Sequence, residues 1–346
     1  MPLNLIHFFN NILKRKNMKH RGQTSLTTKI AVITGASSGV GLATAELFAK
    51  KRYNIILAAR GVEALEKAVS KCNALGSHTV YKSTDMSSAE EVKELVEYCL
   101  SQFGRIDVWV NNAGVMASGK FEDIPMEIHE QVIKTNLMGY MHGAYYVLPV
   151  FKQQNQGILI NNVSIGGYLP APFSAVYSAT KSGIKGVMSG LQSELSIYPE
   201  IHICNIYPQI QRSTGNMHSA KYSGLDFKIP PFAADPMETA KVIYKLTLKP
   251  KKDTFPDVSS YMIKLIHGIF PHTFTNLITA VMRGMMKQAK GKDDEGNILK
   301  PSKEPHQVYG ETSTVLLSDS TKRLVSIGLI IGIGLYTATR IRKNIN

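Results

Sequence analysis

Tyr177 and Lys181 lie four positions apart in the stretch Tyr177-Ser178-Ala179-Thr180-Lys181. In a helix this spacing places both side chains on one face. A tyrosine hydroxyl has a pKa of about 10, and a fixed positive neighbour lowers that pKa by favouring the phenolate. The pair is therefore suited to general acid-base chemistry near neutral pH. The spacing is common by chance, so its meaning depends on the rest of the chain.

Three other short stretches could serve the same chemistry. Residues 34–41, with the sequence TGASSGVG, lie between an apolar run and a helical pattern. Backbone amides at such a turn, with the dipole of the next helix, can hold a pyrophosphate. Asn111-Asn112-Ala113-Gly114 follows a second apolar run, and Ser164 ends a third, thirteen residues before Tyr177. A hydroxyl such as that of Ser164 can bind a carbonyl oxygen on which charge develops.

The elements that must position these residues alternate between strand and helix. We expect strands at 30–34, 54–58, 79–83, 106–110, 157–163 and 201–207, and helices at 40–51, 62–75, 89–103, 126–151, 174–197 and 236–248. This alternation implies right-handed crossovers and a parallel sheet. The expected fold class is therefore α/β, a Rossmann-type doubly wound parallel sheet that forms a single catalytic domain with a helical C-terminal extension. Its ligand should bind at the carboxyl ends of the strands, where all the motifs fall.

Over residues 29–248 these four ordered motifs resemble the classical type of the short-chain dehydrogenase/reductase family. The resemblance implies hydride transfer between a nicotinamide and a carbonyl or secondary alcohol. It also implies a catalytic set of Asn136, Ser164, Tyr177 and Lys181. Tyr177 would donate the proton, Lys181 would keep Tyr177 acidic and bind the nicotinamide ribose, and Asn136 would hold a water that links Lys181 to solvent. A structural role for Asn136 as a helix-kinking residue is not excluded by this assignment.

The choice of cofactor depends on the end of the second predicted strand, which reads Ala58-Ala59-Arg60 and has no acid. An arginine there accommodates a 2′-phosphate, whereas a carboxylate would bind the ribose hydroxyl. We therefore expect NADP(H) in preference to NAD(H), although Arg60 could instead be a solvated surface charge. The full set of expected cofactor-binding residues is Gly35, Ser37, Ser38, Gly39, Val40, Gly41, Arg60, Asp85, Asn112, Ala113, Gly114, Tyr177, Lys181, Pro208, Ile210 and Ser213.

Within that set, Ser37 is a candidate second phosphate contact, and the resemblance assigns Asp85 to the adenine. The chain departs from the family after the sixth strand. The family usually has Pro-Gly, an apolar segment and Thr, whereas this chain has PQIQRS at residues 208–213. Pro208 and Ser213 can keep their roles, but the departure leaves the path of the loop open.

Composition excludes several other function classes. The chain has 346 residues, a net charge of +14 and an ordinary globular composition. The positive charge lies outside the central 31–240, which are close to neutral. No nucleic-acid fold signature accompanies it, so we expect no nucleic-acid partner. Cys72, Cys99 and Cys204 have no metal-ligand spacing. We therefore expect no metal and a reducing compartment.

The predicted organisation has five parts: a basic and apolar N-terminal extension at 1–28, the catalytic domain at 29–258, an amphipathic helical extension at 259–290, a linker at 291–320 and an apolar segment with basic flanks at 321–346. Residues 209–235 are the expected substrate lid. The amphipathic extension could pack on the core, on a second subunit or on a membrane. The apolar run 324–338 is shorter than the roughly 20 residues of a spanning helix. It could enter a membrane or be buried on the protein.

These features together predict an NADP(H)-dependent oxidoreductase for a carbonyl or alcohol substrate. The basic, apolar C-terminal third favours a hydrophobic, lipid-like substrate, with a small soluble carbonyl as the alternative. A cofactor-binding sensor or membrane scaffold without turnover is the alternative from another class. We expect a cytoplasmic homo-oligomer, with membrane association through residues 324–338 as an open option.

Overall fold

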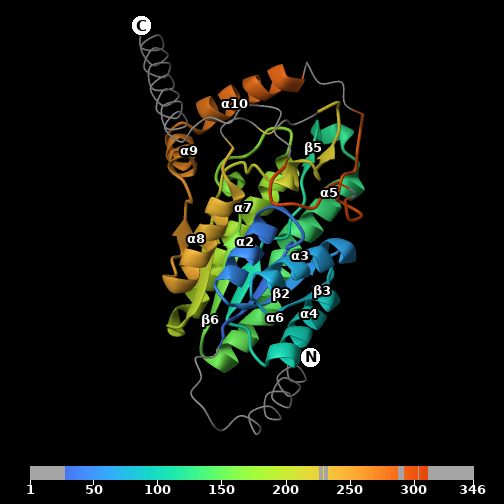
Figure 1. The fold of residues 1–346 in the computed structure, drawn as a ribbon. Coiled ribbons are helices and arrows are strands. Elements are labelled where there is room, and N and C mark those ends of the chain that lie inside the picture. The colour runs from blue at the N-terminus through green and yellow to red at the C-terminus, as the bar shows by residue number, and fades with distance from the viewer. Residues whose placement is uncertain (1–27, 226–228, 230–232, 287–291, 303, 311–346) are drawn as a thin grey trace, which may run out of the picture.

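The structure is a computed structural model that describes residues 28–225, 229, 233–286, 292–302 and 304–310. Seven parallel strands form the central sheet in the order β3-β2-β1-β4-β6-β7-β9 (Figure 1). The strands of this sheet are β1 (Ile30–Thr34), β2 (Asn54–Ala59), β3 (Thr79–Ser83), β4 (Val108–Asn111), β6 (Gly157–Asn162), β7 (Ile201–Ile206) and β9 (Asp253–Thr254). The predicted doubly wound parallel sheet is confirmed.

Helices cover both faces of the sheet, and each layer encloses its own hydrophobic core. One layer contains α2 (Gly39–Lys50), α3 (Val62–Ala74) and α8 (Pro236–Leu248). The other contains α4 (Ala89–Phe103), α6 (Gly139–Gln154) and α7 (Ala175–Glu194). Sequence signals fix the helix ends. Ser88 accepts a hydrogen bond from the Glu91 amide at the start of α4, and Gly104 ends α4 with a φ of 78°.

The remaining elements lie outside the central sheet and the helices that cover it. They are β5 (Ala117–Ser118), α5 (Met126–Ile133), β8 (Ala220–Lys221), α9 (Val258–Ile269), α10 (Pro271–Met286), a π-helix (Lys134–Met138) and 3-10 turns at Phe121–Asp123, Ile165–Gly167, Leu195–Ile197 and Thr214–Asn216. β5 and β8 pair in parallel as a small second sheet.

A row of buried amides crosses the sheet near the carboxyl ends of its strands. Asn111, Asn161, Asn205 and Asp253 are register partners on β4, β6, β7 and β9. The Asn111 Nδ2 donates to Asn161 Oδ1 at 3.0 Å, and the Asn161 Nδ2 donates to Asn205 Oδ1 at 3.1 Å. Since all three asparagines are fully buried, each depends on these partners for its hydrogen bonds. The ladder fixes the register of the strands that end at the site.

Two predicted elements differ from the structure, and the final strand β9 is unusually short. The single helix expected at 126–151 is interrupted by the π-helix, which marks the position of Asn136. The last strand is only two residues long, because Pro256 cannot donate to the ladder. The amphipathic extension is two helices, α9 and α10, that meet at Pro271.

The expected linker packs against the domain over its described part. We call residues 292–302 and 304–310 the C-terminal strap. Ile298 is fully buried in a cluster with residues of β5 and α5, and Val308 is buried against the α2 layer. The strap runs in orange and red across the upper part of the molecule in Figure 1.

The N-terminal extension up to residue 27 and the apolar run 324–338 lie outside the described residues. Among the residues that the structure does describe, no helix has the length and apolar character needed to cross a membrane.

Candidate active site

Tyr177 and Lys181 lie on successive turns near the start of α7, as their spacing predicted. Lys181 is only 4% exposed, and its Nζ lies 5.4 Å from the centre of the Tyr177 ring. The Nζ also lies 5.0 Å from the Tyr140 ring and donates to the Asn162 carbonyl at 3.5 Å. No carboxylate forms an ion pair with Lys181 within the described part of the chain. Aromatic faces and one carbonyl therefore surround the amine.

Burial shifts both groups away from their charged forms. It lowers the pKa of Lys181 to about 7. It raises the pKa of Tyr177, and only a hydrogen bond with Ser164 lowers that pKa in part. The expectation that Lys181 lowers the pKa of Tyr177 is therefore wrong for this structure, because desolvation dominates. The phenol is the stable form of Tyr177, which suits a proton donor.

Ser164 follows β6 directly and has a φ of 100°, which is rare for a residue with a side chain. Its hydroxyl accepts a hydrogen bond from the Gly166 amide at 3.2 Å and contacts the Tyr177 phenol. A Cβ at Gly166 would lie 3.4 Å from the Tyr177 ring. The turn after β6 thus brings the serine and tyrosine hydroxyls together.

Asn136 sits in the π-helix and is fully buried. Its Oδ1 accepts from the Val115 amide at 2.8 Å, and its Nδ2 donates to the Val115 carbonyl at 2.9 Å and to Thr180 Oγ1 at 3.3 Å. Both amide hydrogens are used, so the side chain keeps one free acceptor position. Through these bonds Asn136 fastens the loop after β4 to the helix that carries Lys181.

The glycine-rich turn after β1 lies against the loop after β4. A Cβ on Gly41 would collide with the Gly35 carbonyl and approach the Asn112 Nδ2 to 2.6 Å, so only glycine fits. Asn112 donates to the carbonyls of Thr34 and Gly35 at 3.0 and 3.2 Å. Gly35, with a φ of 62°, has the backbone of Ala113 2.7 Å from its missing Cβ. These contacts fix the backbone of the turn at the N-terminus of α2, where an anion can bind.

Arg60 lies at the end of β2, and the C-terminal strap covers it. Its Nη1 donates to the Ile298 carbonyl at 3.0 Å, and its Nη2 donates to the Asn297 carbonyl. Burial lowers the pKa of Arg60, and the nearby Asp85 opposes that shift. Asp85 itself accepts from the amide and the hydroxyl of Ser87 at 2.9 and 2.8 Å. The guanidinium is thus a partly buried donor that the strap covers rather than a fully solvated surface charge.

The loop after β7 completes the edge of the site. The Pro208 carbonyl accepts from the Ile165 amide at 2.9 Å. Ser213 is buried, and its side chain lies 3.2 Å from the position of a Cβ on Gly39. Ile210 is 47% exposed, so its side chain faces solvent.

The rest of the predicted cofactor set lies near these contacts. Ser37, Ser38 and Val40 lie at the start of α2, where the Ser38 side chain makes no capping bond. A Cβ on Gly114 would lie 3.8 Å from Lys181 Nζ, so the loop after β4 meets the catalytic lysine.

Two residues that the sequence reasoning missed also hold the site together. Thr34 Oγ1 accepts from the amides of Asn112 and Ala113 at 3.0 and 3.1 Å. Thr214 contacts the strap through its hydroxyl. Thr34 begins the glycine-rich stretch and Thr214 follows Ser213, but their roles depend on loops that meet only in the fold.

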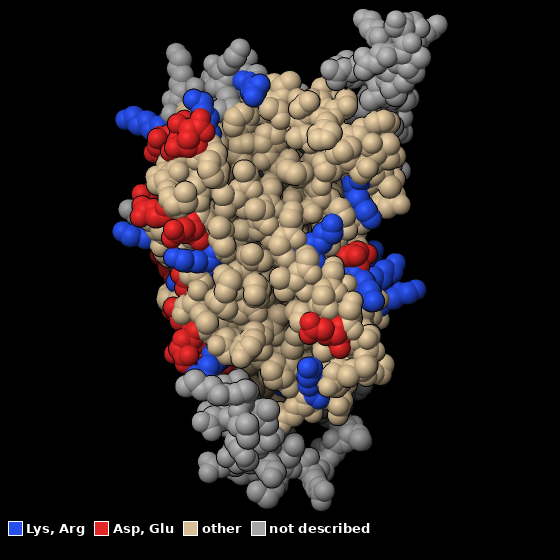
Figure 2. Space-filling model, turned by 180° about the vertical axis from the view of Figure 1, so that it is seen from behind, with Lys and Arg blue, Asp and Glu red and all other residues tan. Residues whose placement is uncertain are grey.

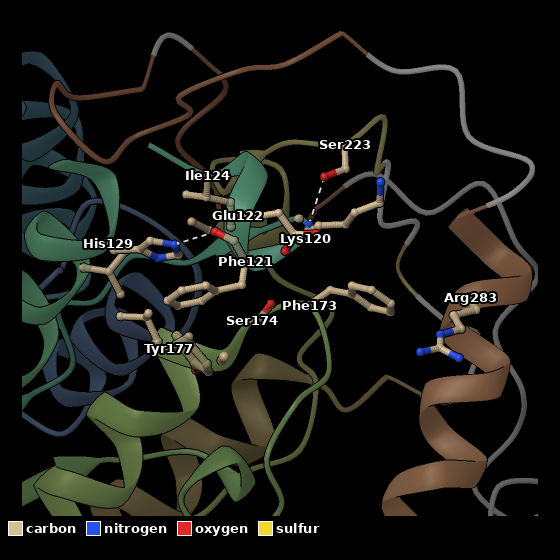
Figure 3. Close-up of a pocket in the computed structure, with 15 residues that line it drawn as sticks. Lys120, Phe121, Glu122, Ile124, His129, Phe173, Ser174, Tyr177, Ser223 and Arg283 are labelled. Carbon is tan, nitrogen blue, oxygen red and sulfur yellow. Dashed lines mark hydrogen bonds between the residues drawn. The ribbon is translucent and has the colours of Figure 1, made fainter. Parts of the chain in front are cut away.

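A cavity of about 640 Å³ opens above Tyr177 (Figure 3). Its walls include the apolar side chains of Phe121, Ile124, Val132, Phe173 and Val176. Lys120, Glu122 and Arg283 supply charged groups, and Arg283 reaches the cavity from α10. The amphipathic extension therefore helps to form the pocket beside the tyrosine.

Comparisons with known proteins agree with this architecture. Residues 29–222 match the family model described as short chain dehydrogenase. An uncharacterized oxidoreductase of Listeria innocua is 37% identical over 185 residues, which cover 53% of this chain and 75% of that protein. An uncharacterized oxidoreductase of Staphylococcus aureus is 33% identical over 225 residues, which cover 65% of this chain and 93% of that protein.

Two solved structures extend the comparison to three dimensions. An alcohol dehydrogenase from the archaeon Thermococcus sibiricus, complexed with 5-hydroxy-NADP, has a TM-score of 0.58 and 27% identity and covers 66% of this chain and 95% of its own. A short-chain dehydrogenase from Streptomyces avermitilis has a TM-score of 0.63 and 25% identity, and the match covers 75% of this chain and 99% of that protein. The family model matches more than half of the chain, and the parallel sheet and the glycine-rich turn agree with it. This chain therefore belongs to the classical short-chain dehydrogenase/reductase family, whose members are NAD(P)-dependent oxidoreductases that act on CH–OH groups.

Proposed function

We propose that this protein interconverts a hydrophobic carbonyl compound and its secondary alcohol with NADP(H), using Ser164, Tyr177 and Lys181 beside the apolar cavity that Tyr177 lines. One observation carries the proposal: Tyr177 lines a pocket large enough for a substrate, its phenol meets the Ser164 hydroxyl, and the buried Lys181 amine lies beside its ring.

Each side chain has a role that follows from its surroundings. The Tyr177 phenol is uncharged and faces the cavity, so it can give a proton to a substrate oxygen. The Ser164 hydroxyl can donate a hydrogen bond to the same oxygen as charge develops there. Lys181, with its pKa near 7, can take up or release the proton that Tyr177 exchanges. A bound nicotinamide would supply or accept the hydride.

Beyond Lys181, the proton needs a route to solvent. Asn136 keeps one acceptor position after its bonds to Val115 and Thr180. We assign it a water that connects Lys181 to solvent, together with a structural role in the π-helix. An Asn136→Ala variant should lower kcat more than the affinity for cofactor.

The donors around the glycine-rich turn fit an anionic dinucleotide. Helix α2 begins at Gly39, and the amides of its first turn have no partners within the helix. Arg60 supplies a partly buried guanidinium at the end of β2. No carboxylate ends β2, so nothing there selects a free ribose hydroxyl. The Thermococcus sibiricus relative was solved with a derivative of NADP. These features support NADP(H) as the preferred cofactor.

The cofactor preference is tested with Arg60→Gln and NADPH and NADH side by side. We expect the ratio of kcat/KM for NADPH to that for NADH to fall by about 10 to 100 times, because a charge-assisted bond to the 2′-phosphate is lost. Loss of the contacts between Arg60 and the strap would change both cofactors alike, so the ratio isolates the phosphate contact. An unchanged ratio would contradict the assignment.

The cavity supports an apolar substrate. Aromatic and aliphatic side chains form most of its walls, as in pockets that select ligands by burial of apolar surface. A lipid-like ketone or aldehyde fits this lining better than a small soluble carbonyl.

A homo-oligomer is supported by an uncharged area on the face of the molecule opposite to the view of Figure 1. Figure 2 shows that Lys, Arg, Asp and Glu lie mainly toward the sides of that face. The exposed positions of α7 up to Ser193 are all small and uncharged, among them Ala179, Ser182 and Gly186, and Tyr145 on α6 is 68% exposed. Such a surface can pack closely against a second copy.

The enzyme assay measures oxidation of NADPH by the purified full chain with ketones and aldehydes that range from small to lipid-like. Tyr177→Phe should lose turnover by at least about 100 times while it keeps its affinity for NADPH. NADH serves as the cofactor control. Turnover that survives in Tyr177→Phe would refute the proposed proton donor. NADPH binding without turnover of any carbonyl would favour the sensor or scaffold alternative.

A further inference from the structure

The C-terminal strap is attached to the domain at both of its ends. Near its start, the Asp294 and Lys221 backbones pair through two hydrogen bonds of 2.7 and 2.8 Å, and the Asn297 amide donates to the His218 carbonyl at 2.8 Å. Near its end, the Tyr309 hydroxyl donates to Asp235 at 3.2 Å. The strap is therefore a fixed part of this structure.

Between these attachments, the strap places a carbonyl oxygen at the start of α2. The Gln307 carbonyl accepts from the Gly39 amide at 2.9 Å and from the Thr214 hydroxyl at 3.0 Å. Gly39 is the first residue of α2, and the amides of a first helical turn have no partners within the helix. These amides and the helix dipole are the features that bind phosphate at a helix N-terminus. One strap oxygen thus uses a donor of the pyrophosphate site.

A second group of strap oxygens lies on Arg60. The guanidinium donates to the carbonyls of Asn297, Ile298 and Lys300, the first two through separate nitrogens and the third at 3.5 Å. Arg60 is the residue that we assign to the 2′-phosphate. The strap therefore presents neutral oxygens to both anion-binding places of the proposed dinucleotide site.

We propose that the C-terminal strap is an internal competitor of the cofactor, which closes the dinucleotide site and must leave it before NADP(H) binds. This inference rests on the proposed function, since it concerns the regulation of the same site. The phosphates of a dinucleotide form charge-assisted hydrogen bonds, which are about twice as strong as those of neutral carbonyls. Burial of Ile298 and Val308 favours the closed strap. The apparent affinity for cofactor is reduced by the fraction of molecules that are closed.

A designed disulfide tests the proposal directly. A Cβ on Gly61 would lie 3.7 Å from the Cβ of Pro301, which is the usual separation in a disulfide. Gly61 has a φ of −84°, so a cysteine fits its backbone. The three native cysteines are buried and free, which limits mispairing. The Gly61→Cys/Pro301→Cys variant should lock the strap closed when oxidised.

The measurement is the affinity for NADPH, from calorimetry or cofactor fluorescence, of the oxidised and the reduced double variant. We expect oxidation to weaken binding by at least tenfold and a reductant to restore it. Each single cysteine variant, treated in the same way, controls for oxidation itself. Equal affinity of the locked and reduced forms would overturn the proposal.

A release variant tests the opposite direction. Ile298→Asp places a carboxylate in an apolar cluster and should free the strap, so that NADPH binds several times more tightly than to the unchanged protein. Leu299→Asp adds the same charge at a neighbouring position that is 41% exposed, and it should leave the affinity unchanged. Equal affinities of these two variants for NADPH would contradict the role of Ile298 in holding the strap closed. Failure of every form to bind NADPH or NADH would instead refute the dinucleotide site and, with it, the strap as its competitor.

Discussion

Replacement of Lys181 by Met should stabilise the fold, and the gain should be largest at low pH. Lys181 is 4% exposed and has no carboxylate partner among the described residues. Burial lowers its pKa from 10.5 to about 7, a difference worth roughly 5 kcal/mol. Methionine is similar in length and keeps the contacts with the Tyr140 and Tyr177 rings without a charge. Burial of this amine therefore lowers the free energy of unfolding.

The sign of the pH dependence follows from proton binding in the two states. Below pH 7, Lys181 is charged in both states, and the folded state carries the full cost of its burial. Between pH 7 and 10.5 the unfolded chain binds the proton that the folded protein has lost, so the free energy of unfolding rises with pH. From pH 6 to pH 9 the free energy of unfolding of the unchanged protein should rise by about 3 kcal/mol through Lys181, and Lys181→Met should lack this rise.

Urea unfolding of both proteins at pH 6 and pH 9 measures this difference. The stability gap should favour Lys181→Met at pH 6 and shrink by about 3 kcal/mol at pH 9, and comparison within one pair cancels all other titrating groups. Lys185→Met removes a partly exposed lysine of the same helix and controls for the loss of a lysine as such. A gap that stays constant within about 0.5 kcal/mol would show that the folded protein keeps Lys181 charged at pH 9.

Three further tests concern the packing and the substrate contacts of the site. Gly143→Ala should lower the free energy of unfolding in urea by about 1 to 3 kcal/mol, because its Cβ would lie 2.8 Å from the Trp109 indole nitrogen. The control Gly186→Ala has nothing within 4 Å of its Cβ and should raise that free energy by about 0.5 to 1 kcal/mol. In urea unfolding, Ser164→Gly should be more stable than Ser164→Ala by about 1 kcal/mol, because both lose the hydroxyl and only alanine keeps the strain of the positive φ. Equal stability of the two variants would count against backbone strain at this position. Phe121→Ala should raise KM about tenfold for bulky apolar carbonyls and leave small ones unchanged, and an equal rise for both would place Phe121 outside the substrate site.

Local patterns were enough to predict the sheet and the motifs at its edge. The strand at Ile30–Thr34 is a run of buried apolar residues, and the Tyr177 to Lys181 spacing needs only helical geometry. The pKa of Tyr177 could not be predicted in this way. Its direction depends on how deeply the phenol and its neighbours are buried, and burial is a property of the assembled fold.

The strap shows a different limit of sequence reasoning. Residues 291–320 are polar and contain prolines, which is typical of a linker. Ile298 and Val308 lie in a segment without helical or strand periodicity, so their burial leaves no pattern in the sequence. The contacts with Gly39 and Arg60 use backbone carbonyls, which every residue has. Nothing in the side chains of the strap could have indicated them.

The arrangement of these contacts also predicts how the strap should open. Gln307 and the carbonyls on Arg60 belong to one segment that is anchored by Ile298 and Val308. If the segment leaves as a unit, the closed fraction lowers the affinities for NADPH and NADH by the same factor. Ile298→Asp should then tighten both cofactors equally and keep their ratio. A larger gain for NADPH would show instead that the strap can release Arg60 while Gln307 still covers Gly39, because only NADPH uses Arg60 for its 2′-phosphate. Binding of the two cofactors to this one variant therefore separates a strap that moves as a single unit from one that opens in two steps.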